Sequence, residues 1–513
     1  MESKLMQRPR YLFQKHLNLS KPAEGNVSSK LRKGSPLMLL KYFYDQSLAH
    51  ASYMLGCQKS GEALIIDPSR HITPYLEAAQ AAGLQIVAAA ETHIHADFVS
   101  GSRELADHVG AMLHLSNAGP TEWKYDVSDL QNINLVTDGD TFQIGNIQLE
   151  IIHTPGHTPE SISLLVTDLG GGATAPMGIF TGDFMFVGSM GRPDLLETAA
   201  GVIGSAKEGA RELFQSAERF KQLPDYLQVW PAHGAGSACG KNLGAIQSTT
   251  VGYEKRFNPS LQFSDETSFV QYILAEQPET PHHFGRMKKV NKQGAKLLSE
   301  LHPIRTLQPQ ELTRVSQTQP MIDVRPVAEY MKAHMPGSMN IPLADLGQWA
   351  GSLIDYDSPL TIIGNTNDLI SSVHILRSIG IDLIEYHINS VALEREGLMT
   401  EKLISATPKI LAPGIQTGSS WLLDVRSQVE WQNGHAPQAH HHFLGNLQNE
   451  LSLLPAKTRI ITQCMSGKRS AIAASLLQAK GFTVVNMSGG FPAWQKAGLT
   501  VVRTAESEPL LYS

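Results

Sequence analysis

The chain has 513 residues, 42% of them apolar and 18% charged, so it can bury several cores and is not a disordered protein. At about 100–200 residues per domain, this length predicts three or four domains. The formal net charge of −6 argues against a nucleic-acid partner. No apolar run approaches the roughly 18 residues that a membrane span needs, so no membrane partner is expected. Three cysteines exclude a disulfide scaffold and fit a reducing compartment.

Residues 1–36 differ in charge from the rest of the chain. They hold eight basic and two acidic residues, which leaves a net charge of −12 on the remainder. They lack the apolar segment of a secretory signal. We expect a basic, disordered extension, or that Met38 is the true first residue of the protein. A transit peptide is the alternative. The expected location is the cytoplasm, or the mitochondrion if these residues are a transit peptide.

From residue 39 to about 300, strands come first and helices are then interleaved. The pattern predicts strands over 39–45, 51–57, 62–68, 84–90, 111–115, 141–144, 147–153, 161–167, 177–181 and 227–230. Helical periodicity is expected over 73–82, 201–223 and 267–274. Gly145-Asn146 is a hairpin-type turn signal between two of the strands.

After residue 301 the chain contains an internal repeat. The stretch that begins at Met321 recurs from Leu422, with its Asp-Val-Arg, Glu, His and Pro residues at a constant offset of 101. A repeat of this length is too long for a solenoid. It predicts two tandem copies of one small α/β domain, with linkers near 300–308 and 402–412.

Six side chains that can bind a metal follow four of the apolar strands. Side chains two apart in an extended segment point the same way, and ligands at the ends of neighbouring strands converge in one crevice. A lone histidine after a strand is more often structural, as we expect for His153, but the recurrence at strand ends argues against coincidence. The candidates are His93, His95, Asp97, His157, Asp183 and His233.

The strings THIHADF, HTPGHTPES, FTGD and PAHG resemble the metallo-β-lactamase superfamily over residues 37–300. This resemblance implies an αββα sandwich. Phe98 stands where the family pattern HxHxDH has its last histidine, so a ligand of a second metal is missing.

One metal is then the natural interpretation, and the persulfide dioxygenase branch of the fold binds one iron. By position, the Fe(II) ligands would be His93, His157 and Asp183, a set typical of non-haem iron oxygenases. His95, Asp97 and His233 would orient these ligands or metal-bound water, or hold a second metal. Zinc is the alternative metal, in a thioester hydrolase of the glyoxalase II type.

Further strings resemble the same branch, namely SMGRPDL, PAHGAGSACGK and FGRMKKVN. Arg192 would anchor a substrate carboxylate or make a structural salt bridge. Cys239 is expected near the metal, with a role on the substrate side. GAGSACGKN is a near miss to a phosphate loop, but Asn242 stands where Ser or Thr must bind magnesium, so nucleotide binding is rejected.

An apolar strand runs into Cys464, which a loop at 465–469 and a helix from about 470 to 477 follow. Free backbone N–H groups, a helix N-terminus, Lys468 and Arg469 would favour the thiolate and make Cys464 nucleophilic; a buried inert cysteine is the alternative. CxxGxRS, between LDVRSQVEW and GGFPAWQKAGL, resembles the rhodanese family over 410–505. The resemblance implies a persulfide on Cys464, assisted by Arg469, while Asp424 and Arg426 brace the fold.

The first copy of the repeat, over 306–400, keeps DVRPVAEYMKAHMPGSMNIPL but contains no cysteine, and its equivalent loop is IIGNTNDLISS. It is expected to be an inactive rhodanese-like domain. Cys57 is expected in the core. The His440-His441-His442 run is expected to belong to a strand rather than to a metal site.

The domain order resembles bacterial persulfide dioxygenase–rhodanese fusions of sulfide detoxification. The resemblance implies oxidation of glutathione or coenzyme A persulfide by O₂ to sulfite, coupled to sulfur transfer to or from thiosulfate. The expected partners are therefore the persulfide, O₂, sulfite and thiosulfate; a homo-oligomer stays open. Besides the zinc hydrolase, a non-catalytic sulfur carrier that retains the folds is an alternative.

Overall fold

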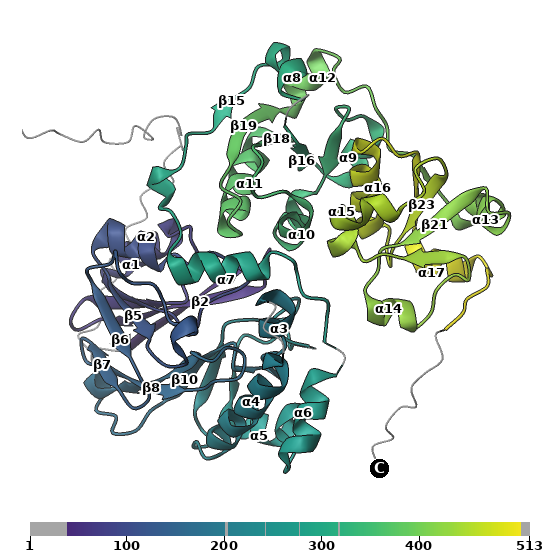
Figure 1. Cartoon of the computed structure of the whole chain (residues 1–513). Helices are drawn as coiled ribbons and strands as arrows, with labels where there is room; N and C mark the ends of the chain where they lie inside the picture. The colour runs from purple at the N-terminus through teal and green to yellow at the C-terminus, as the bar shows by residue number, and fades with distance from the viewer. Residues whose placement is uncertain (1–37, 201–203, 242, 276, 317–318, 504–513) are drawn as a thin grey trace, which may run out of the picture. The chain divides into compact units, whose positions relative to one another are not determined.

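The computed structural model describes residues 38–200, 204–241, 243–275, 277–316 and 319–503 (Figure 1). The basic extension expected over residues 1–36 lies outside this part of the chain. None of the described helices has both the length and the apolar character that a membrane crossing requires.

The first sheet is built from the strands that begin the described chain. Its order is β1-β2-β3-β4-β5-β6, with β1 to β3 antiparallel and β3 to β6 parallel. The strands are β1 (Met38–Asp45), β2 (His50–Cys57), β3 (Glu62–Ile66), β4 (Gln85–Ala90), β5 (Met112–Ser116) and β6 (Ile133–Val136). Helices α1 (Thr73–Ala82) and α2 (Ser102–Val109) connect the parallel strands and cover one face of the sheet.

The second sheet has the order β14-β13-β10-β9-β8-β7. Its strands are β7 (Thr141–Ile144), β8 (Ile147–His153), β9 (Ile162–Asp168), β10 (Gly178–Gly182), β13 (Gln228–Pro231) and β14 (Thr249–Thr250). The hairpin β11 (Met185–Phe186) and β12 (Ser189–Met190) follows β10. The helices of this region are α3 (Leu195–Ala200), α4 (Ser205–Lys221), α5 (Val251–Phe257), α6 (Glu266–Leu274) and α7 (Phe284–Gln293).

Alternation along the strands places one apolar core between the two sheets and another outside them. Leu64 of the first sheet and Leu164 of the second share the inner core. The next residue, Leu165, faces the other way and packs with Leu213 of α4 and Phe269 of α6. Figure 1 shows α4, α5 and α6 beside one another below β10. The four layers form the predicted αββα sandwich.

The repeat forms two parallel sheets with the same strand order. The middle sheet has the order β15-β19-β18-β16-β17, and the C-terminal sheet β20-β24-β23-β21-β22. Their strands are β15 (Arg305–Thr306), β16 (Met321–Asp323), β17 (Ser338–Asn340), β18 (Leu360–Gly364), β19 (Ile384–Asn389), β20 (Ser405–Ala406), β21 (Ser420–Asp424), β22 (Ala439–His441), β23 (Arg459–Gln463) and β24 (Val484–Met487). This shared order confirms two copies of one α/β fold.

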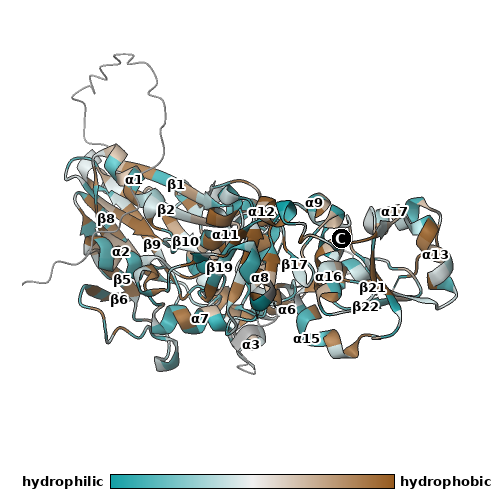
Figure 2. Cartoon of the chain, turned by 90° about the horizontal axis from the view of Figure 1, so that it is seen from above, coloured by the Kyte–Doolittle hydropathy of each residue, from teal (hydrophilic) through white to brown (hydrophobic). Residues whose placement is uncertain are grey.

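Helices lie on both faces of these sheets. They are α8 (Pro309–Val315), α9 (Val327–Lys332), α10 (Leu346–Leu353), α11 (Thr366–Ser378) and α12 (Ser390–Arg395) in the first copy, and α13 (Pro408–Gln416), α14 (Gln428–Gln432), α15 (Leu447–Glu450), α16 (Lys468–Ala479) and α17 (Gly490–Lys496) in the second. Figure 2 shows apolar and polar residues mixed in α13, whose Leu411 and Ile415 are buried.

The two copies and the sandwich are packed together. One apolar core runs through both copies, because Leu346 and Leu376 of the first share it with Leu447 and Leu476 of the second. Arg70, 1% exposed, joins the sandwich to the first copy. Its guanidinium donates to the Asp382 carboxylate at 2.6 and 3.1 Å and to the Arg377 carbonyl at 2.9 Å.

Candidate functional site

Three of the predicted ligands converge at one end of the sandwich. His93 follows β4, His157 follows β8 and Asp183 follows β10, and each is 2% exposed or less. The Asp183 Oδ2 atom lies 3.8 Å from His93 Nε2 and 3.5 Å from His157 Nε2. One ligand atom from each residue lies within 4.8 Å of the other two.

A hydrogen bond at Nδ1 fixes the orientation of each imidazole ring. The Thr92 hydroxyl donates to Asp67, so at 3.0 Å it accepts from His93 Nδ1. His157 Nδ1 donates to the Arg192 carbonyl at 3.1 Å. Both rings therefore present an unprotonated Nε2 to Asp183, as metal-binding histidines do.

The atoms that face one another have no hydrogen-bond partner within the described chain. They are His93 Nε2, His157 Nε2, Asp183 Oδ1 and Asp183 Oδ2. Four buried polar atoms left without a partner at one point are costly unless a cation satisfies them. These residues therefore fit a metal ion.

A second group lies beside the first. Asp97, His233 and Cys239 also bring one ligand atom each within 4.8 Å of one another. His233 Nε2 lies 3.2 Å from Asp97 Oδ2 and 3.4 Å from Asp183 Oδ1, while its Nδ1 donates to the Ala49 carbonyl at 2.9 Å. Burial raises the pKa of the Cys239 thiol to about 12, so the residue is a thiol unless a metal binds it.

The sequence interpretation places Cys239 near the metal but does not group it with Asp97 and His233. The only signal in the sequence is that the cysteine follows His233 by six residues. Asp97 is far from both in sequence, and only the fold joins them.

His95 lies outside both groups. Its Nε2 lies 3.1 Å from Asp67 Oδ1. Although burial opposes it, Asp67 raises the pKa of His95 to about 9, so this ring carries a proton and pairs with a carboxylate. Asp67 is a residue that sequence reasoning missed. Its role here is to hold Thr92 and His95 behind the metal-binding face.

Phe98 fills the space beside His95. Its side chain is fully buried, and its ring centroid lies 3.9 Å from that of His50 and 4.4 Å from that of His95. The position that the family pattern gives to a further histidine ligand therefore holds an apolar ring.

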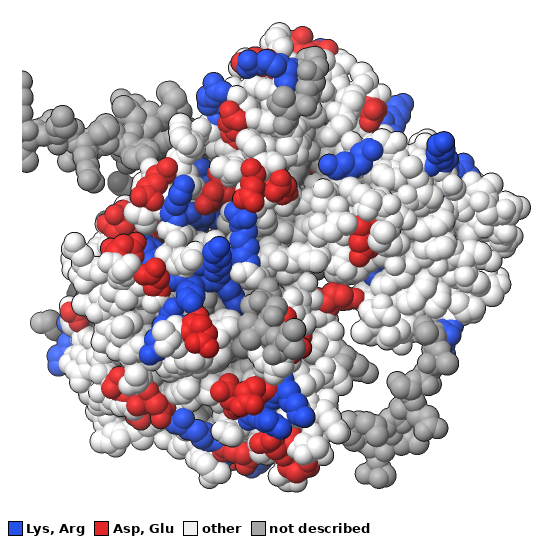
Figure 3. All heavy atoms as spheres, in the orientation of Figure 1, with Lys and Arg blue, Asp and Glu red and all other residues white. Residues whose placement is uncertain are grey.

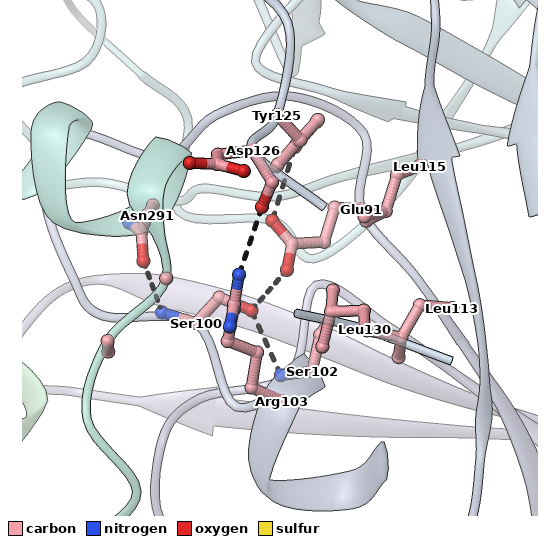
Figure 4. A pocket seen from close by; sticks show the side chains of 12 residues that line it. Glu91, Ser100, Ser102, Arg103, Leu113, Leu115, Tyr125, Asp126, Leu130 and Asn291 are labelled. Atoms are coloured by element: carbon pink, nitrogen blue, oxygen red, sulfur yellow. Dashed lines mark hydrogen bonds between the residues drawn. The ribbon is translucent and has the colours of Figure 1, made fainter. Parts of the chain in front are cut away.

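A polar cluster supports the His93–Phe98 loop from behind (Figure 4). Asn291 of α7 donates to the carbonyls of His95 and Phe98 at 2.8 and 2.6 Å and accepts from the Ser100 amide at 2.9 Å. The cavity among these side chains is only about 20 Å³, which is room for about one water. We therefore interpret this cluster as structural support for the His93–Phe98 loop and not as a ligand-binding site.

Helix α7 also contributes a buried lysine that sequence reasoning missed. Lys288 is 5% exposed, and its Nζ has no hydrogen-bond partner among the described residues. Burial and the charge of Lys288 together hold the pKa of His157 well below its usual range, which keeps that imidazole neutral. The opposite side of α7 exposes Arg286 and Lys289, in the area where Figure 3 shows basic side chains gathered.

Arg192 is buried, and its guanidinium is already hydrogen-bonded within the protein. Its guanidinium donates to Asp194 at 3.0 and 2.6 Å and to the Ala238 carbonyl at 3.2 Å. These bonds correspond to the structural salt bridge expected as the alternative to substrate binding. The part of Arg192 that serves the site is its backbone carbonyl, which positions His157.

Cys464 lies directly after β23, and its side chain is buried. The Gly467 amide donates to its Sγ at 3.1 Å, and Gly467, with φ of 94°, caps α16. The helix begins at Lys468, two residues before the predicted start, so Lys468 and Arg469 belong to its first turn. Arg469 pairs with Glu430 at 2.6 and 2.7 Å.

The first copy lacks both the thiol and the loop. Val324 and Val425 donate equivalent backbone bonds of 2.9 Å to Ile363 and Gln463, which aligns Gly364 with Cys464. One residue separates Gly364 from α11, whereas three separate Cys464 from α16. In both copies a buried arginine pairs with the Asp of the Asp-Val-Arg string, at 2.6 and 2.7 Å, which accounts for the repeated motif.

Comparison with known proteins places these features in families. Residues 47–233 match the metallo-β-lactamase superfamily, and residues 308–388 and 407–497 each match the rhodanese-like domain. The crystal structure of a metallo-β-lactamase from Staphylococcus aureus is 40% identical, with a TM-score of 0.63, and the match covers 69% of this chain and 99% of that one. The chain belongs to the metallo-β-lactamase superfamily. The fold predicted from the sequence, including the tandem rhodanese-like domains, is confirmed.

Two curated relatives match the metallo-β-lactamase domain. The mitochondrial persulfide dioxygenase ETHE1 of Bos taurus is 28% identical over 257 residues, which is 48% of this chain and 84% of the bovine protein. A probable hydroxyacylglutathione hydrolase of Schizosaccharomyces pombe is 27% identical over 227 residues, which is 42% of this chain and 83% of the yeast protein. Together with the rhodanese-like domains, these similarities support an enzyme of sulfur metabolism that uses a metal ion and small sulfur-containing substrates.

His153, His441 and His442 have structural hydrogen-bond partners, and Cys57 lies in a core. His153 Nε2 bonds to the Pro159 carbonyl at 2.9 Å. His441 Nε2 bonds to the Arg426 carbonyl at 2.7 Å, and His442 Nδ1 lies 2.6 Å from the Glu450 carboxylate. Cys57 is buried in the inner core of the sandwich, as expected.

Proposed function

We propose that the metallo-β-lactamase domain oxidises a low-molecular-weight persulfide, such as glutathione persulfide, with O₂ at one iron, and that the second rhodanese-like domain transfers sulfur through Cys464. The observation that carries this proposal is the His93–His157–Asp183 group, together with the buried Phe98 in place of a further ligand. Similarity to persulfide dioxygenases supports it. Both reactions fit sulfane-sulfur detoxification in a reducing compartment, which we take to be the cytoplasm.

Two imidazoles and one carboxylate form a ligand set that non-haem Fe(II) oxygenases use, and a bound iron would activate O₂ there. The net reaction is RSSH + O₂ + H₂O → RSH + SO₃²⁻ + 2H⁺, in which the terminal sulfur is oxidised and O₂ is reduced. The Thr92 hydroxyl and the Arg192 carbonyl would keep both rings in the binding tautomer. His233, which lies 3.2 Å from Asp97 and 3.4 Å from Asp183, would orient Asp183 toward the metal, and the released protons would pass to solvent.

Sulfur transfer needs a thiol that can accept and release one sulfur atom. Cys464 Sγ would attack the outer sulfur of thiosulfate, the S–S bond of thiosulfate would break, and sulfite would leave. The Gly467 amide and the N-terminus of α16 would stabilise the resulting terminal sulfur anion. Arg469, held by Glu430, adds positive charge at this position.

A zinc-dependent thioester hydrolase is the second candidate. The Asp97–His233–Cys239 group favours it, because a carboxylate, an imidazole and a thiolate would suit a second ion of the zinc type. The similarity to a probable hydroxyacylglutathione hydrolase points the same way. In that case the buried Phe98 would not limit the site to one metal.

The two candidates are separated by metal content and by the reaction that is observed. Protein produced with both iron and zinc available should contain about one iron per chain and consume O₂ only when glutathione persulfide is added. The same protein should not hydrolyse S-lactoylglutathione. Bound zinc, thioester hydrolysis and no O₂ uptake would show that the hydrolase is correct and the dioxygenase wrong.

A further inference from the structure

A cleft of about 600 Å³ is lined by all three domains. Its volume falls within the roughly 300–1,000 Å³ that small-molecule sites occupy. The metallo-β-lactamase domain, the cysteine-free rhodanese-like domain and the Cys464 loop each supply part of its wall. Two candidate active sites therefore border one cleft, and the question is which molecule binds in it.

Part of the cleft wall comes from residues that surround the metal position. Asp97, whose carboxylate lies 3.2 Å from His233, lines it directly. Ala49 lines it as well, and the Ala49 carbonyl accepts the hydrogen bond that orients His233. Phe284, which packs against Cys239, forms the adjacent wall. A ligand in the cleft therefore lies against the groups that surround the metal position.

Another part of the wall comes from the Cys464 loop and the helix that follows it. Ser466 lies within the Cys464 loop, and Lys468 and Arg469 form the first turn of the helix that follows. Glu430, which fixes Arg469, also lines the cleft. The Cys464 loop therefore reaches the cleft through Ser466, Lys468 and Arg469, while Cys464 itself is buried behind them.

The first rhodanese-like domain, which has no cysteine, supplies a third part of the wall. Ala344, Gln348 and Trp349, at and beside α10, line it. This domain contributes no reactive group, so its contribution here is the shape of the wall.

We propose that the cleft is a common binding site for the small thiol that carries sulfur, so that a persulfide formed at Cys464 is oxidised at the metal site before it leaves the chain. The inference rests on the proposed function. The transfer is Cys464–S–SH + RSH → Cys464–SH + RSSH. The bond between Cys464 Sγ and the outer sulfur breaks, a bond to the carrier sulfur forms, and a proton moves from the carrier to Cys464 without net oxidation.

The charges of the wall indicate the class of carrier. Four carboxylates line the cleft against two cations, and one of these cations is already paired with Glu430. The residues are Asp97, Glu279, Asp345, Glu430, Lys468 and Arg469. This excess of negative charge disfavours a polyanionic carrier of the coenzyme A type, and Phe284 and Trp349 provide apolar surface. A small peptide thiol of the glutathione type fits better.

Isotope dilution tests the shared site. The enzyme is given unlabelled glutathione together with thiosulfate that carries a label on its outer sulfur, and unlabelled glutathione persulfide is present at about 0.1 mM. The measured quantity is the labelled fraction of the sulfite that is newly formed by oxidation. A local concentration on the order of 1 mM in the cleft predicts labelling about tenfold above the bulk value. An equimolar mixture of C464S and D183N chains must pass the persulfide through solution and should show the bulk value.

Equal labelling by the wild type and the mixture would overturn the proposal. A wild type that makes no sulfite from added glutathione persulfide would instead refute the proposed function. Replacing glutathione by coenzyme A should lower the excess labelling. An excess as large with coenzyme A as with glutathione would overturn the assignment of the carrier.

A wall variant tests the part assigned to the first rhodanese-like domain. Ala344→Trp, at an exposed position on the cleft, should reduce the excess labelling toward the value of the mixture. Val391→Trp is the matched control, because Val391 is 54% exposed in the same domain and does not line the cleft. Unchanged labelling in Ala344→Trp, or the same loss in both variants, would contradict the role of the wall.

Discussion

Gly490 lies against the backbone of the Cys464 loop, and its replacement by alanine should slow sulfur transfer about 100-fold. A Cβ atom at this position would lie 2.3 Å from the Cys464 carbonyl oxygen and 2.5 Å from that of Met465. Both neighbours are backbone atoms, so no side chain can rotate to make room. The adjacent Phe491 amide donates to the same Cys464 carbonyl at 2.8 Å, which ties the two segments together.

The size of the effect follows from the overlap. Real Cβ contacts are essentially never below 3.0 Å, so the Cys464 loop must move by roughly 1 Å. A displacement of that size near a reacting group costs about 100-fold in rate. Gly490 also has φ of 58°, and a Cβ in the left-handed region adds about 1–2 kcal/mol of backbone strain.

Gly481→Ala separates the strain from the clash. Gly481 has φ of 85°, and a Cβ there would meet nothing within 4 Å, so this variant carries the strain alone. Transfer from thiosulfate to glutathione should fall about 100-fold in Gly490→Ala and stay near the wild-type rate in Gly481→Ala. O₂ uptake with added glutathione persulfide should survive in both. Transfer rates within twofold of each other in the two variants would show that the packing argument is wrong.

Three further predictions concern the metal, the domain contact and the response to pH. Asp183→Asn removes the anionic ligand and should reduce bound iron to near zero by metal analysis while sulfur transfer through Cys464 continues; retained iron would exclude Asp183 as a ligand. Arg70→Ala removes a buried guanidinium that donates to the Asp382 carboxylate and to the carbonyls of Arg377 and Lys296, so the free energy of unfolding should fall by about 2–3 kcal/mol. Arg286→Ala, which breaks an exposed pair, should cost under about 1 kcal/mol, and equal losses in the two variants would contradict this prediction. Burial lowers the pKa of His114 to about 4 in the folded protein, against 6.5 in the unfolded chain, so protonation favours unfolding between these values. The free energy of unfolding should therefore be unaffected by this group above pH 6.5 and fall by roughly 3 kcal/mol as the pH is lowered toward 4 in denaturant titrations. If a His114→Gln variant shows the same dependence of unfolding free energy on pH, this histidine is excluded as the cause.

Most strands of the sandwich could be predicted because their burial is continuous or alternating, whereas the short strands β6, β11, β12 and β14 were not predicted. The predicted bounds of β7 and β8 agree with the structure, as do those of α1. Helix α2 was not predicted, since only Ser102 and Leu105 of its side chains are buried and two residues make no apolar stripe. Helix α7 was missed for a different reason: its buried face includes Lys288 and Asn291, so the hydrophobic period is broken.

The ligand positions at strand ends could likewise be predicted, because they depend on local spacing. The relation between Cys239 and Asp97 could not, since 142 positions separate them and no local pattern connects them. The role of Asp67 was hidden in the same way, since its bonds to Thr92 and His95 depend on how β3 and β4 pair. The cleft is the extreme case, because its wall combines segments from residue 46 to residue 469.

The short turn after Gly364 means that a cysteine alone would not give the first rhodanese-like domain the loop that surrounds Cys464. A cysteine at this position would have Asn365 alone between it and α11, where the active copy has a three-residue loop that supplies the Gly467 amide. Its Cβ would also lie 2.8 Å from the Val324 side chain. A loop like that of Cys464 would require a substitution and a two-residue insertion together, which no single point mutation provides.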